Sequence, residues 1–319
     1  MVSNIIVVAG PTASGKSALA VRYVRCLRSN GIDAEIVNAD SVQLYNGLKI
    51  LTARPSTALL SLANHHLYGV LSPQSSSSVA DWLQLAREKI QRLRQQNKIA
   101  IVCGGTGLYI DALLNGISNI PSIPFEFRNE TMKKFQKMGR DDFFNLLASL
   151  DPELCKTLHK NNTQRILRAY EVISYTGMPL SQWWREGRGT GYKAFTMVLL
   201  PPRDQLRERC LLRIKKMMQA SVIEEVKSFI EKYPNYSGSL AKVIGYRELI
   251  SFLQREISLD ECMRRMHTRT MQYAKRQCTW FRHNIQPDHV FQDFGEGVQL
   301  LTEAHLLALH ANYGLELLK

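Results

Sequence analysis

Residues 5–17 read Ile5-Ile-Val-Val-Ala9-Gly10-Pro-Thr-Ala-Ser-Gly15-Lys16-Ser17, and this stretch decides the fold. Residues 5–9 form a short, continuous, β-branched run, which is typical of a strand buried on both faces. Residues 10–17 match the pattern G-x-x-x-x-G-K-S, and the apolar spacing that follows, over residues 17–28, predicts a helix. A strand, a glycine-containing loop and a helix in this order constitute a phosphate-binding loop, the P-loop.

Each part of this loop has a task in binding phosphate. The glycines allow backbone N–H groups to curl around phosphate oxygens. Lys16 supplies a mobile positive charge, Ser17 a hydroxyl ligand for a Mg²⁺ cofactor, and the helix its positive N-terminal end. The loop alone does not decide whether the phosphates belong to a nucleotide. The predicted phosphate-binding residues are Gly10, Pro11, Thr12, Ala13, Ser14, Gly15, Lys16 and Ser17.

Further strands follow at intervals that leave room for helices between them. Residues 34–38 and 99–103 are strand candidates, with a polar-faced helix expected over residues 79–94. Alternating strands and helices predict an α/β fold, a P-loop NTPase-like parallel sheet flanked by helices. Binding sites in such sheets lie at the carboxyl ends of the strands. We therefore expect the P-loop, Asp40-Ser41 and Gly104-Gly105-Thr106 to converge on one crevice.

The middle of the chain has a different character. Residues 119–193 carry helix signals and few strand signals, including an Asp151-Pro152 helix start and a Gly177 stop. Residues 195–200 then return to a strand pattern, and long helical patterns cover residues 204–233 and 259–283. The predicted organisation is a catalytic core of residues 1–118 and 194–319, interrupted by an all-helical insertion of residues 119–193.

Composition narrows the class of partner. The chain has 319 residues, with 41 Lys and Arg against 28 Asp and Glu, which gives a net charge of +13 and favours an anionic partner such as nucleic acid. Its six cysteines are scattered without zinc-ligand spacing, as expected of reduced thiols. The first apolar run stops at Gly10-Pro11, too early for a signal sequence or a membrane span. We expect a soluble, cytoplasmic protein, and a monomer because nothing marks an interface.

Five ordered segments resemble one family, the tRNA dimethylallyltransferases of bacterial type, also called isopentenyl-tRNA transferases. The resemblance covers residues 5–290. A P-loop by itself would be weak evidence, whereas five motifs in order and at sensible spacing are specific. The segments are 10–17, 40–45 (Asp-Ser-Val-Gln-Leu-Tyr), 104–109 (Gly-Gly-Thr-Gly-Leu-Tyr), 242–247 (Lys-Val-Ile-Gly-Tyr-Arg) and 273–282 (Tyr-Ala-Lys-Arg-Gln-Cys-Thr-Trp-Phe-Arg).

The resemblance implies a specific reaction. The family transfers a dimethylallyl group from dimethylallyl diphosphate to N6 of the adenine 3′ of the anticodon in tRNA and releases pyrophosphate. The P-loop would then hold the diphosphate of the prenyl donor, with Lys16, Ser17 and Mg²⁺ neutralising the leaving group. An arginine from residues 204–233 would assist them. Arg209 and Arg213 share one helix face, and we favour Arg213.

The acceptor amine needs activation, because its lone pair is delocalised into the adenine ring. Asp40 is the candidate general base, although an Asp at this position is also an ordinary helix cap or loop acid. Thr106 is the candidate for a hydrogen bond that orients the amine, although Gly-Gly-Thr-Gly forms a turn in any case. The four predicted catalytic residues are Asp40, Thr106, Lys16 and Arg213.

Two basic segments point to RNA. Residues 264–282 hold six Arg and Lys and no acid, with aromatic residues interleaved, which suggests a face that follows phosphates. Residues 164–168 add a second basic set in the insertion, which we expect to clamp the anticodon stem-loop while the target adenine is extruded. The resemblance implies that the tRNA-binding residues are Asp40, Ser41, Val42, Gln43, Thr106, Arg128, Gln164, Arg165, Ile166, Leu167, Arg168, Lys242, Gly245, Tyr246, Arg247, Lys275, Arg276, Gln277, Thr279, Trp280 and Arg282.

One stretch departs from the family pattern. Residues 49–55 read Lys-Ile-Leu-Thr-Ala-Arg-Pro where the family usually has an Asp-Ile-Gly-Thr-Ala-Lys-Pro type of sequence, so the geometry of this loop is open. Three other functions remain as alternatives: a prenyltransferase acting on free adenine nucleotide, a P-loop small-molecule kinase, and a non-catalytic P-loop protein that binds nucleic acid.

Overall fold

The computed structural model describes residues 5–297. The chain divides into two compact units, one made of Met1–Leu114 with Tyr192–Lys319 and the other of Asn115–Gly191. The sequence placed the insertion at residues 119–193. All six cysteines lie in the described residues and are free thiols. No helix in residues 5–297 is both long and apolar enough to cross a lipid bilayer.

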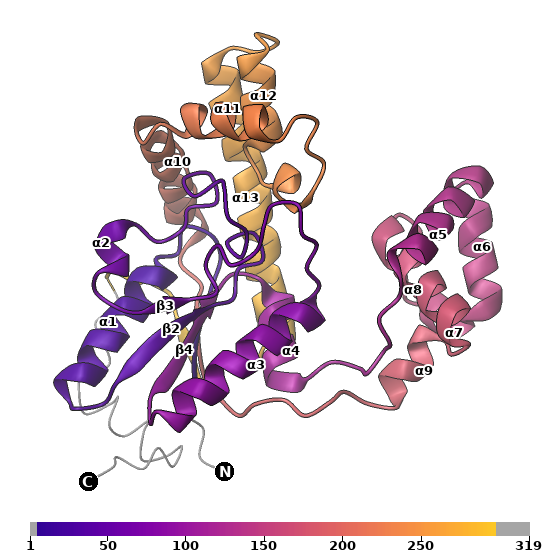
Figure 1. Cartoon of the computed structure of the whole chain (residues 1–319), viewed down its shortest axis with the longest axis horizontal. Helices are drawn as coiled ribbons and strands as arrows, with labels where there is room; N and C mark the ends of the chain where they lie inside the picture. Colours follow the sequence, from indigo (N-terminus) through magenta and orange to yellow (C-terminus); the bar gives the residue numbers. More distant parts are fainter. Residues whose placement is uncertain (1–4, 298–319) are drawn as a thin grey trace. The chain divides into compact units, whose positions relative to one another are not determined.

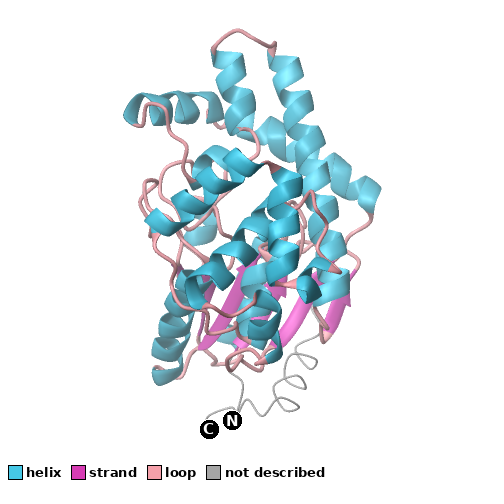
Figure 2. Ribbon diagram, turned by 90° about the vertical axis from the view of Figure 1, so that its right-hand side faces the viewer, coloured by secondary structure: helices cyan, strands magenta, loops and turns pink. Residues whose placement is uncertain are grey.

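A parallel sheet forms the centre of the first unit, with helices packed around it (Figures 1 and 2). It has six strands in the order β3-β2-β4-β1-β5-β6. This confirms the predicted P-loop NTPase-like α/β fold. The two outermost strands, β3 and β6, are short and were not predicted from the sequence. The strands are β1 (Ile5–Ala9), β2 (Ala34–Asn38), β3 (His65–His66), β4 (Ile99–Gly104), β5 (Phe195–Leu199) and β6 (His289–Phe291).

The register of the sheet brings three loops to the same edge. The last residue of β1, Ala9, is level with Gly104 of β4, and the last residue of β2, Asn38, is level with Cys103. The residues that follow these strands are the P-loop, Asp40-Ser41 and Gly105-Thr106. The β-branched composition of β1 fits its place between β4 and β5, since all five of its residues are buried.

Helices pack on the sheet and extend beyond its carboxyl edge. Helices α1 and α3 contact β2 and β4, while α10 packs on α13 and α12 packs on α11 and α13. The single helical pattern expected over residues 204–233 is wrong, because Ser221 adopts a left-handed φ of 66° and separates α10 from α11. The helices of this unit are α1 (Lys16–Ser29), α2 (Thr57–Leu60), α3 (Val79–Gln95), α4 (Gly107–Asn115), α10 (Arg203–Gln219), α11 (Val222–Lys232), α12 (Tyr246–Leu253) and α13 (Leu259–Asn284), with a 3₁₀ turn at Ser239–Lys242.

The second unit is all helical and has its own hydrophobic core. Phe143, Leu147 and Ile166 are completely buried at its centre. Asp151 ties its short elements together, because its carboxylate accepts hydrogen bonds from the Leu154 N–H and from the Ser181 hydroxyl. The helices are α5 (Phe125–Met138), α6 (Arg140–Leu150), α7 (Pro152–Cys155), α8 (Thr163–Thr176) and α9 (Leu180–Arg185).

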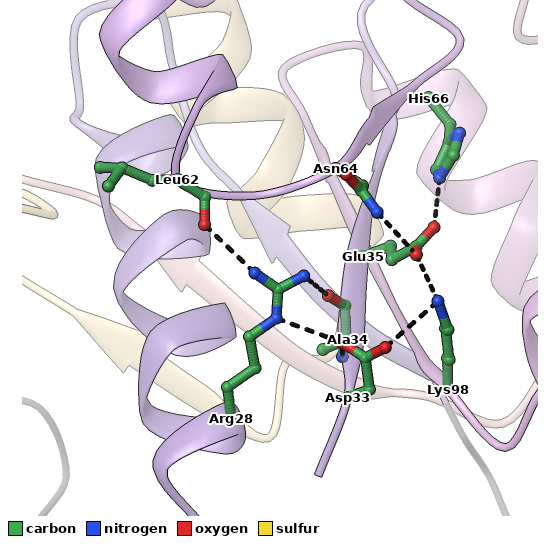
Figure 3. A network of polar contacts seen from close by, with 8 residues as sticks. All are labelled: Arg28, Asp33, Ala34, Glu35, Leu62, Asn64, His66 and Lys98. Carbon is green, nitrogen blue, oxygen red and sulfur yellow. Dashed lines mark hydrogen bonds and ion pairs between the residues drawn. The ribbon is translucent and has the colours of Figure 1, made fainter.

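A buried acid anchors the amino end of β2, away from the carboxyl edge (Figure 3). The Glu35 carboxylate accepts hydrogen bonds from Lys98 Nζ at 2.7 Å and Asn64 Nδ2 at 2.9 Å, and lies 2.5 Å from His66 Nε2. Burial by itself would raise the pKa of Glu35, but its hydrogen bonds with Lys98, Asn64 and His66 outweigh that effect and lower the pKa to about 2. This network stabilises the sheet and plays no part in the site described next.

Candidate active site and nucleic-acid interface

The P-loop packs against a segment near the end of the described chain. Gly15 caps α1 with a φ of 83°, a backbone conformation that favours glycine. A Cβ atom at Gly15 would lie 2.7 Å from the Gly295 nitrogen, which itself donates a hydrogen bond to the Ser14 carbonyl at 2.9 Å. Lys16 Nζ donates to the Pro11 carbonyl at 3.2 Å, so the lysine folds back over its own loop.

A cavity of about 710 Å³ opens beside the loop, lined entirely by residues of the first unit. One part of its wall is apolar and includes Leu59, Leu212 and Met217. Glu296 is the one acid among the lining residues of the described chain. A cavity that combines concentrated positive charge with an apolar wall suits a diphosphate carrying a short hydrocarbon group. Its cations are Lys16, Lys49, Arg54, Arg209, Arg213 and Lys216.

Lys16, Arg213 and Asp40 interact electrostatically. Burial lowers the pKa of Lys16, while the neighbouring Asp40 carboxylate opposes this shift and the Arg213 charge adds to it. Burial also lowers the pKa of Arg213, against the attraction of Cys210 and Asp40. Lys16 and Arg213 both line the cavity, and the Asp40 carboxylate interacts electrostatically with both of them.

Arg209 lines the same cavity but is held in place by other groups. Its Nη2 atom forms an ion pair with Glu296 Oε1 at 2.8 Å, and its guanidinium lies 4.4 Å from the centre of the Phe294 ring. Arg213 forms no such pair with any described acid. The geometry therefore favours Arg213 over Arg209 as the cation available to a bound diphosphate.

Asp40 lies on a tight turn directly after β2. Its N–H donates to Asn38 Oδ1 at 2.9 Å, and its own Oδ1 accepts from the Val42 N–H at 3.2 Å. These bonds fix the direction of the carboxylate, whereas Oδ2 accepts no hydrogen bond from any residue in the range 5–297. A half-buried carboxylate with one unoccupied oxygen has the geometry that a proton acceptor requires.

Thr106 lies beside this turn, as expected. Its Oγ1 accepts from the Ser41 N–H at 3.0 Å, and its N–H donates to the Ala39 carbonyl at 3.2 Å. Gly104 makes this approach possible, because a Cβ atom there would lie 2.1 Å from the Ala39 oxygen. Thr106 thus contacts the turn that carries Asp40 through the neighbouring residues Ala39 and Ser41.

Helix α13 covers the P-loop and the loop after β4 with one face. Gln277 is buried on this face, where its amide bonds to the backbone of Thr12 and Gly105. Trp280 packs against Gly107, since a Cβ atom at Gly107 would lie 2.1 Å from the indole ring. The Gln277 side chain is thus engaged with both loops, and its contact with tRNA stays a prediction.

The opposite face of α13 is exposed and basic. A groove of about 470 Å³ runs along it, lined by residues of α13 alone, among them the exposed Lys275, Arg276 and Thr279. In the described chain no acid pairs with Lys275, Arg276 or Arg282, which are exposed. This face has the charge and shape expected of a surface that binds RNA phosphates.

Half of the basic residues in the run 264–282 are neutralised by acids outside it. Arg264 and Arg265 pair with Glu261 at 2.7 and 2.6 Å, and Arg269 pairs with the buried Glu248. The phosphate-binding face is therefore narrower than the sequence suggested.

The segment 242–247 divides in the same way between exposed and buried residues. Lys242 and Arg247 are exposed and available to an anionic partner. Gly245 and Tyr246 are buried: Gly245 caps α12 with a φ of 99°, and Tyr246 packs against the Phe229 ring at 6.0 Å. Both residues stabilise the fold of this segment, and their contact with tRNA stays a prediction.

The helical unit presents its own cations. Gln164 and Arg165 are exposed on α8, and the Arg165 guanidinium lies 5.3 Å from the centre of the Trp184 ring. The side chains of Ile166 and Leu167 are instead part of the hydrophobic core of this unit, and the contact of these two residues with tRNA stays a prediction.

Arg128 and Arg168 both act on Glu171 in this unit. Arg168 Nη1 lies 3.8 Å from Glu171 Oε2. Burial raises the pKa of Glu171, although the charges of Arg168 and Arg128 oppose this. With one acid between two arginines, the cluster keeps a surplus of positive charge, and Arg128 is exposed.

The loop that departs from the family pattern is well fixed. Gln43 Nε2 donates to the Thr52 and Ala53 carbonyls at 2.9 and 3.0 Å, while Val42 is half-buried beside it. The Glu225 carboxylate accepts from the Ile50 and Leu51 N–H groups at 2.8 and 3.0 Å. Gln43 is thus engaged with its own loop through its amide nitrogen.

Sequence reasoning missed several residues of the cavity. Lys49 and Arg54 line it from the departing loop, Lys216 from α10, and Glu296 from the segment after β6. The signal for Lys49 was present, because it stands where the family usually has an acid. Nothing in the sequence indicated that Glu296 would lie beside Gly15.

Comparisons with known proteins agree with this geometry. A sequence profile of the family described as IPP transferase matches residues 43–284. The chain is similar to the tRNA dimethylallyltransferase of Pelagibacter ubique, with 40% identity over 282 residues that cover 88% of each chain. It is also similar to that of Rhodospirillum centenum, with 38% identity over 284 residues, covering 88% of this chain and 89% of the relative.

Solved structures show the same fold. The full-length tRNA isopentenylpyrophosphate transferase from Bacillus halodurans is 27% identical, with a TM-score of 0.67 and coverage of 97% of this chain and 96% of that one. A eukaryotic dimethylallyltransferase acting on tRNA gives a TM-score of 0.82 at 23% identity, covering 97% of this chain and 79% of that one. At this lower identity the likeness concerns the fold alone.

Proposed function

Because the chain belongs to the IPP transferase family, we propose that it is a tRNA-modifying prenyltransferase. It transfers a dimethylallyl group from dimethylallyl diphosphate to N6 of the adenine 3′ of the anticodon and releases pyrophosphate. The observation that carries this proposal is that Lys16 and Arg213, which line the cavity, both interact electrostatically with the Asp40 carboxylate. The cations stabilise the leaving pyrophosphate, while the carboxylate accepts the proton of the attacking N6 amine.

The P-loop residues 10–17 bind the diphosphate through backbone N–H groups, the N-terminal end of α1 and Lys16. Arg213 lies beside Lys16 and stabilises the charge that develops on the departing pyrophosphate. The apolar wall of the cavity receives the dimethylallyl group. This division of the cavity agrees with its lining of six cations and several aliphatic side chains.

The cofactor that fits this site is Mg²⁺. Ser17 places a hydroxyl on the first turn of α1, beside Lys16 and against the thiol of Cys103. Residues 5–297 contain no cluster of three or more His, Cys, Asp and Glu side chains that could hold a metal by itself. Ser17 and the substrate phosphates would therefore share the ion, as Mg²⁺ prefers. Once bound, it would supply charge neutralisation at the diphosphate.

Asp40 acts as the general base. Its free Oδ2 accepts a proton from the N6 amine while the new N–C bond forms and the C–O bond to the diphosphate breaks. Thr106 contributes a hydrogen bond that orients the amine. The carboxylate and the threonine are held together through Ser41, which supports a joint role on the acceptor.

The tRNA is bound by exposed or half-buried cations of both units. In the first unit, RNA phosphates are contacted by Lys275, Arg276 and Arg282 of α13 and by Lys242 and Arg247. The helical unit grips the anticodon stem-loop through Arg128, Arg165 and Arg168. An adenine must leave the stacked loop to reach Asp40, which costs less in a loop than in a duplex. We propose that the enzyme acts as a monomer in the cytoplasm.

One experiment separates this function from transfer to a free nucleotide. Purified protein is incubated with dimethylallyl diphosphate and Mg²⁺, with unmodified tRNA in one tube and AMP in a second. We expect prenylated tRNA and unchanged AMP. Prenylated AMP beside unmodified tRNA would contradict the proposal and favour the free-nucleotide alternative.

A further inference from the structure

We propose that Gln277 is a positioning residue for group transfer, which holds the diphosphate loop and the acceptor loop at a fixed separation. The inference rests on the proposed function, and it concerns a side chain that does not itself touch either substrate. Gln277 is buried on the inner face of α13, with 6% of its surface exposed.

A single amide connects the two loops. Gln277 Oε1 accepts a hydrogen bond from the Thr12 N–H at 2.8 Å, and Nε2 donates to the Gly105 carbonyl at 2.8 Å. Thr12 belongs to the P-loop, and Gly105 directly precedes Thr106. The amide therefore spans from the loop that binds the leaving group to the loop that orients the nucleophile.

Glutamine is suited to this task because its side chain ends in both a donor and an acceptor. Asparagine would be one methylene too short to reach both loops, and glutamate would place an acceptor against the Gly105 carbonyl. The fit also requires glycine opposite it, since a Cβ atom at Gly105 would lie 2.6 Å from Gln277 Nε2. Both partners of the bridge are thus constrained.

The bridge is rigid because α13 is docked at a second point. Trp280, three residues further on, packs against Gly107 at the start of α4. The opposite face of the same helix carries Lys275 and Arg276, the exposed cations that we assign to RNA. One helix therefore joins the RNA-binding face to both loops of the reaction centre.

Transfer requires the electrophilic carbon and the amine nitrogen to be aligned at close range, and a misplacement of about 1 Å can cost about 100-fold in rate. The P-loop and the 104–106 loop each bind their own substrate. Without Gln277 each loop retains its ligand, but their mutual distance is no longer fixed. We therefore expect the loss to fall on kcat and not on substrate binding.

Two variants test this. Gln277→Met keeps the length of the side chain and removes both hydrogen bonds. Gln277→Glu keeps the acceptor for Thr12 and removes the donor to Gly105. Thr196→Val serves as a matched control, because it removes a buried polar group at the amino end of β5, far from the loops. The wild type and the three variants are compared below the melting temperature of the least stable protein.

The readouts are kcat and KM for dimethylallyl diphosphate with an anticodon stem-loop RNA, and Kd for inorganic pyrophosphate by calorimetry. For Gln277→Met we expect kcat to fall by about 100-fold, with KM and Kd near the wild-type values, and an intermediate loss for Gln277→Glu. Thr196→Val should keep kcat even if its melting temperature falls.

Two results would overturn the assignment: folded Gln277 variants with wild-type kcat, or a loss of pyrophosphate affinity that accounts for the whole loss of activity. An inactive wild-type protein that still binds pyrophosphate would instead overturn the proposed function, and this inference with it.

Discussion

Ser41 and Thr106 are joined by two hydrogen bonds across the carboxyl edge of the sheet. The Ser41 N–H donates to Thr106 Oγ1 at 3.0 Å, and the Thr106 hydroxyl donates to Ser41 Oγ at 3.3 Å. The turn that carries Asp40 is thereby fixed to the loop after β4. The predicted general base and the residue predicted to orient the amine are therefore held in a fixed position relative to each other.

Replacing Asp40 by asparagine should abolish most of the transfer while leaving RNA binding intact. The amide has the same shape but cannot accept the amine proton, so kcat should fall by about 10²- to 10⁴-fold. Single-turnover prenylation of an anticodon stem-loop measures the rate, and fluorescence anisotropy measures RNA affinity. Asp204→Asn, at an exposed acid in the first turn of α10, is the control. Full activity of Asp40→Asn would remove the general-base assignment.

Arg213 and Arg209 should differ in their importance. Removing Arg213 takes away a cation that the cavity leaves available, and a loss of about 10²- to 10³-fold in kcat is expected of a missing charge stabiliser. Arg209→Ala should have a smaller effect, because Glu296 already engages that side chain. Steady-state kinetics on Arg213→Ala and Arg209→Ala give the comparison. A larger loss for Arg209→Ala would mean that the two roles are reversed.

The exposed face of α13 should govern the salt dependence of RNA binding. Each of the substitutions Lys275→Gln, Arg276→Gln and Arg282→Gln removes one cation from this face and should reduce the slope of log K against log salt by about 0.7 to 0.9. Arg264→Gln is the matched control on the same helix, since Arg264 is paired with Glu261. Titrations at several salt concentrations measure the slopes. If Arg264→Gln and Arg276→Gln reduced this slope equally, the ion pair of Arg264 with Glu261 would not keep that arginine from binding RNA.

The Glu35 network should make the fold sensitive to acid (Figure 3). The pKa of Glu35 is lowered from 4.5 to about 2 in the folded protein, so its contribution is present above pH 4.5 and is lost as the pH falls toward 2. A shift of this size corresponds to about 3 kcal/mol. Urea unfolding at several pH values should show this loss in the wild type and a flatter profile in Glu35→Gln. Parallel profiles for the two proteins would contradict the assignment.

The features that follow from local sequence were predictable. A β-branched strand, a glycine loop and a helix specify their own conformations, and parallel strands bring their carboxyl ends to one edge, so Lys16, Asp40 and Thr106 converge as expected. Family resemblance added Arg213 and the exposed cations of α13.

The remaining features depend on contacts between distant segments. Gln277 lies within a basic motif, and the sequence does not say that this one side chain points inward while its neighbours Arg276 and Thr279 point outward. Glu296 lies beside the P-loop in the structure, although almost the whole chain separates the two in the sequence. Ser221 breaks a helix that its flanking residues would otherwise continue, because its φ is left-handed.

The proposed enzyme transfers a dimethylallyl group to one adenine of a tRNA anticodon loop. This transfer is tested most directly by nucleoside mass spectrometry of an anticodon stem-loop after incubation with the enzyme, dimethylallyl diphosphate and Mg²⁺. A second RNA carries guanine at the position 3′ of the anticodon. We expect an N6-dimethylallyl adenine at that position in the first RNA and no product in the second. Equal product in both RNAs, or none in either, would contradict it.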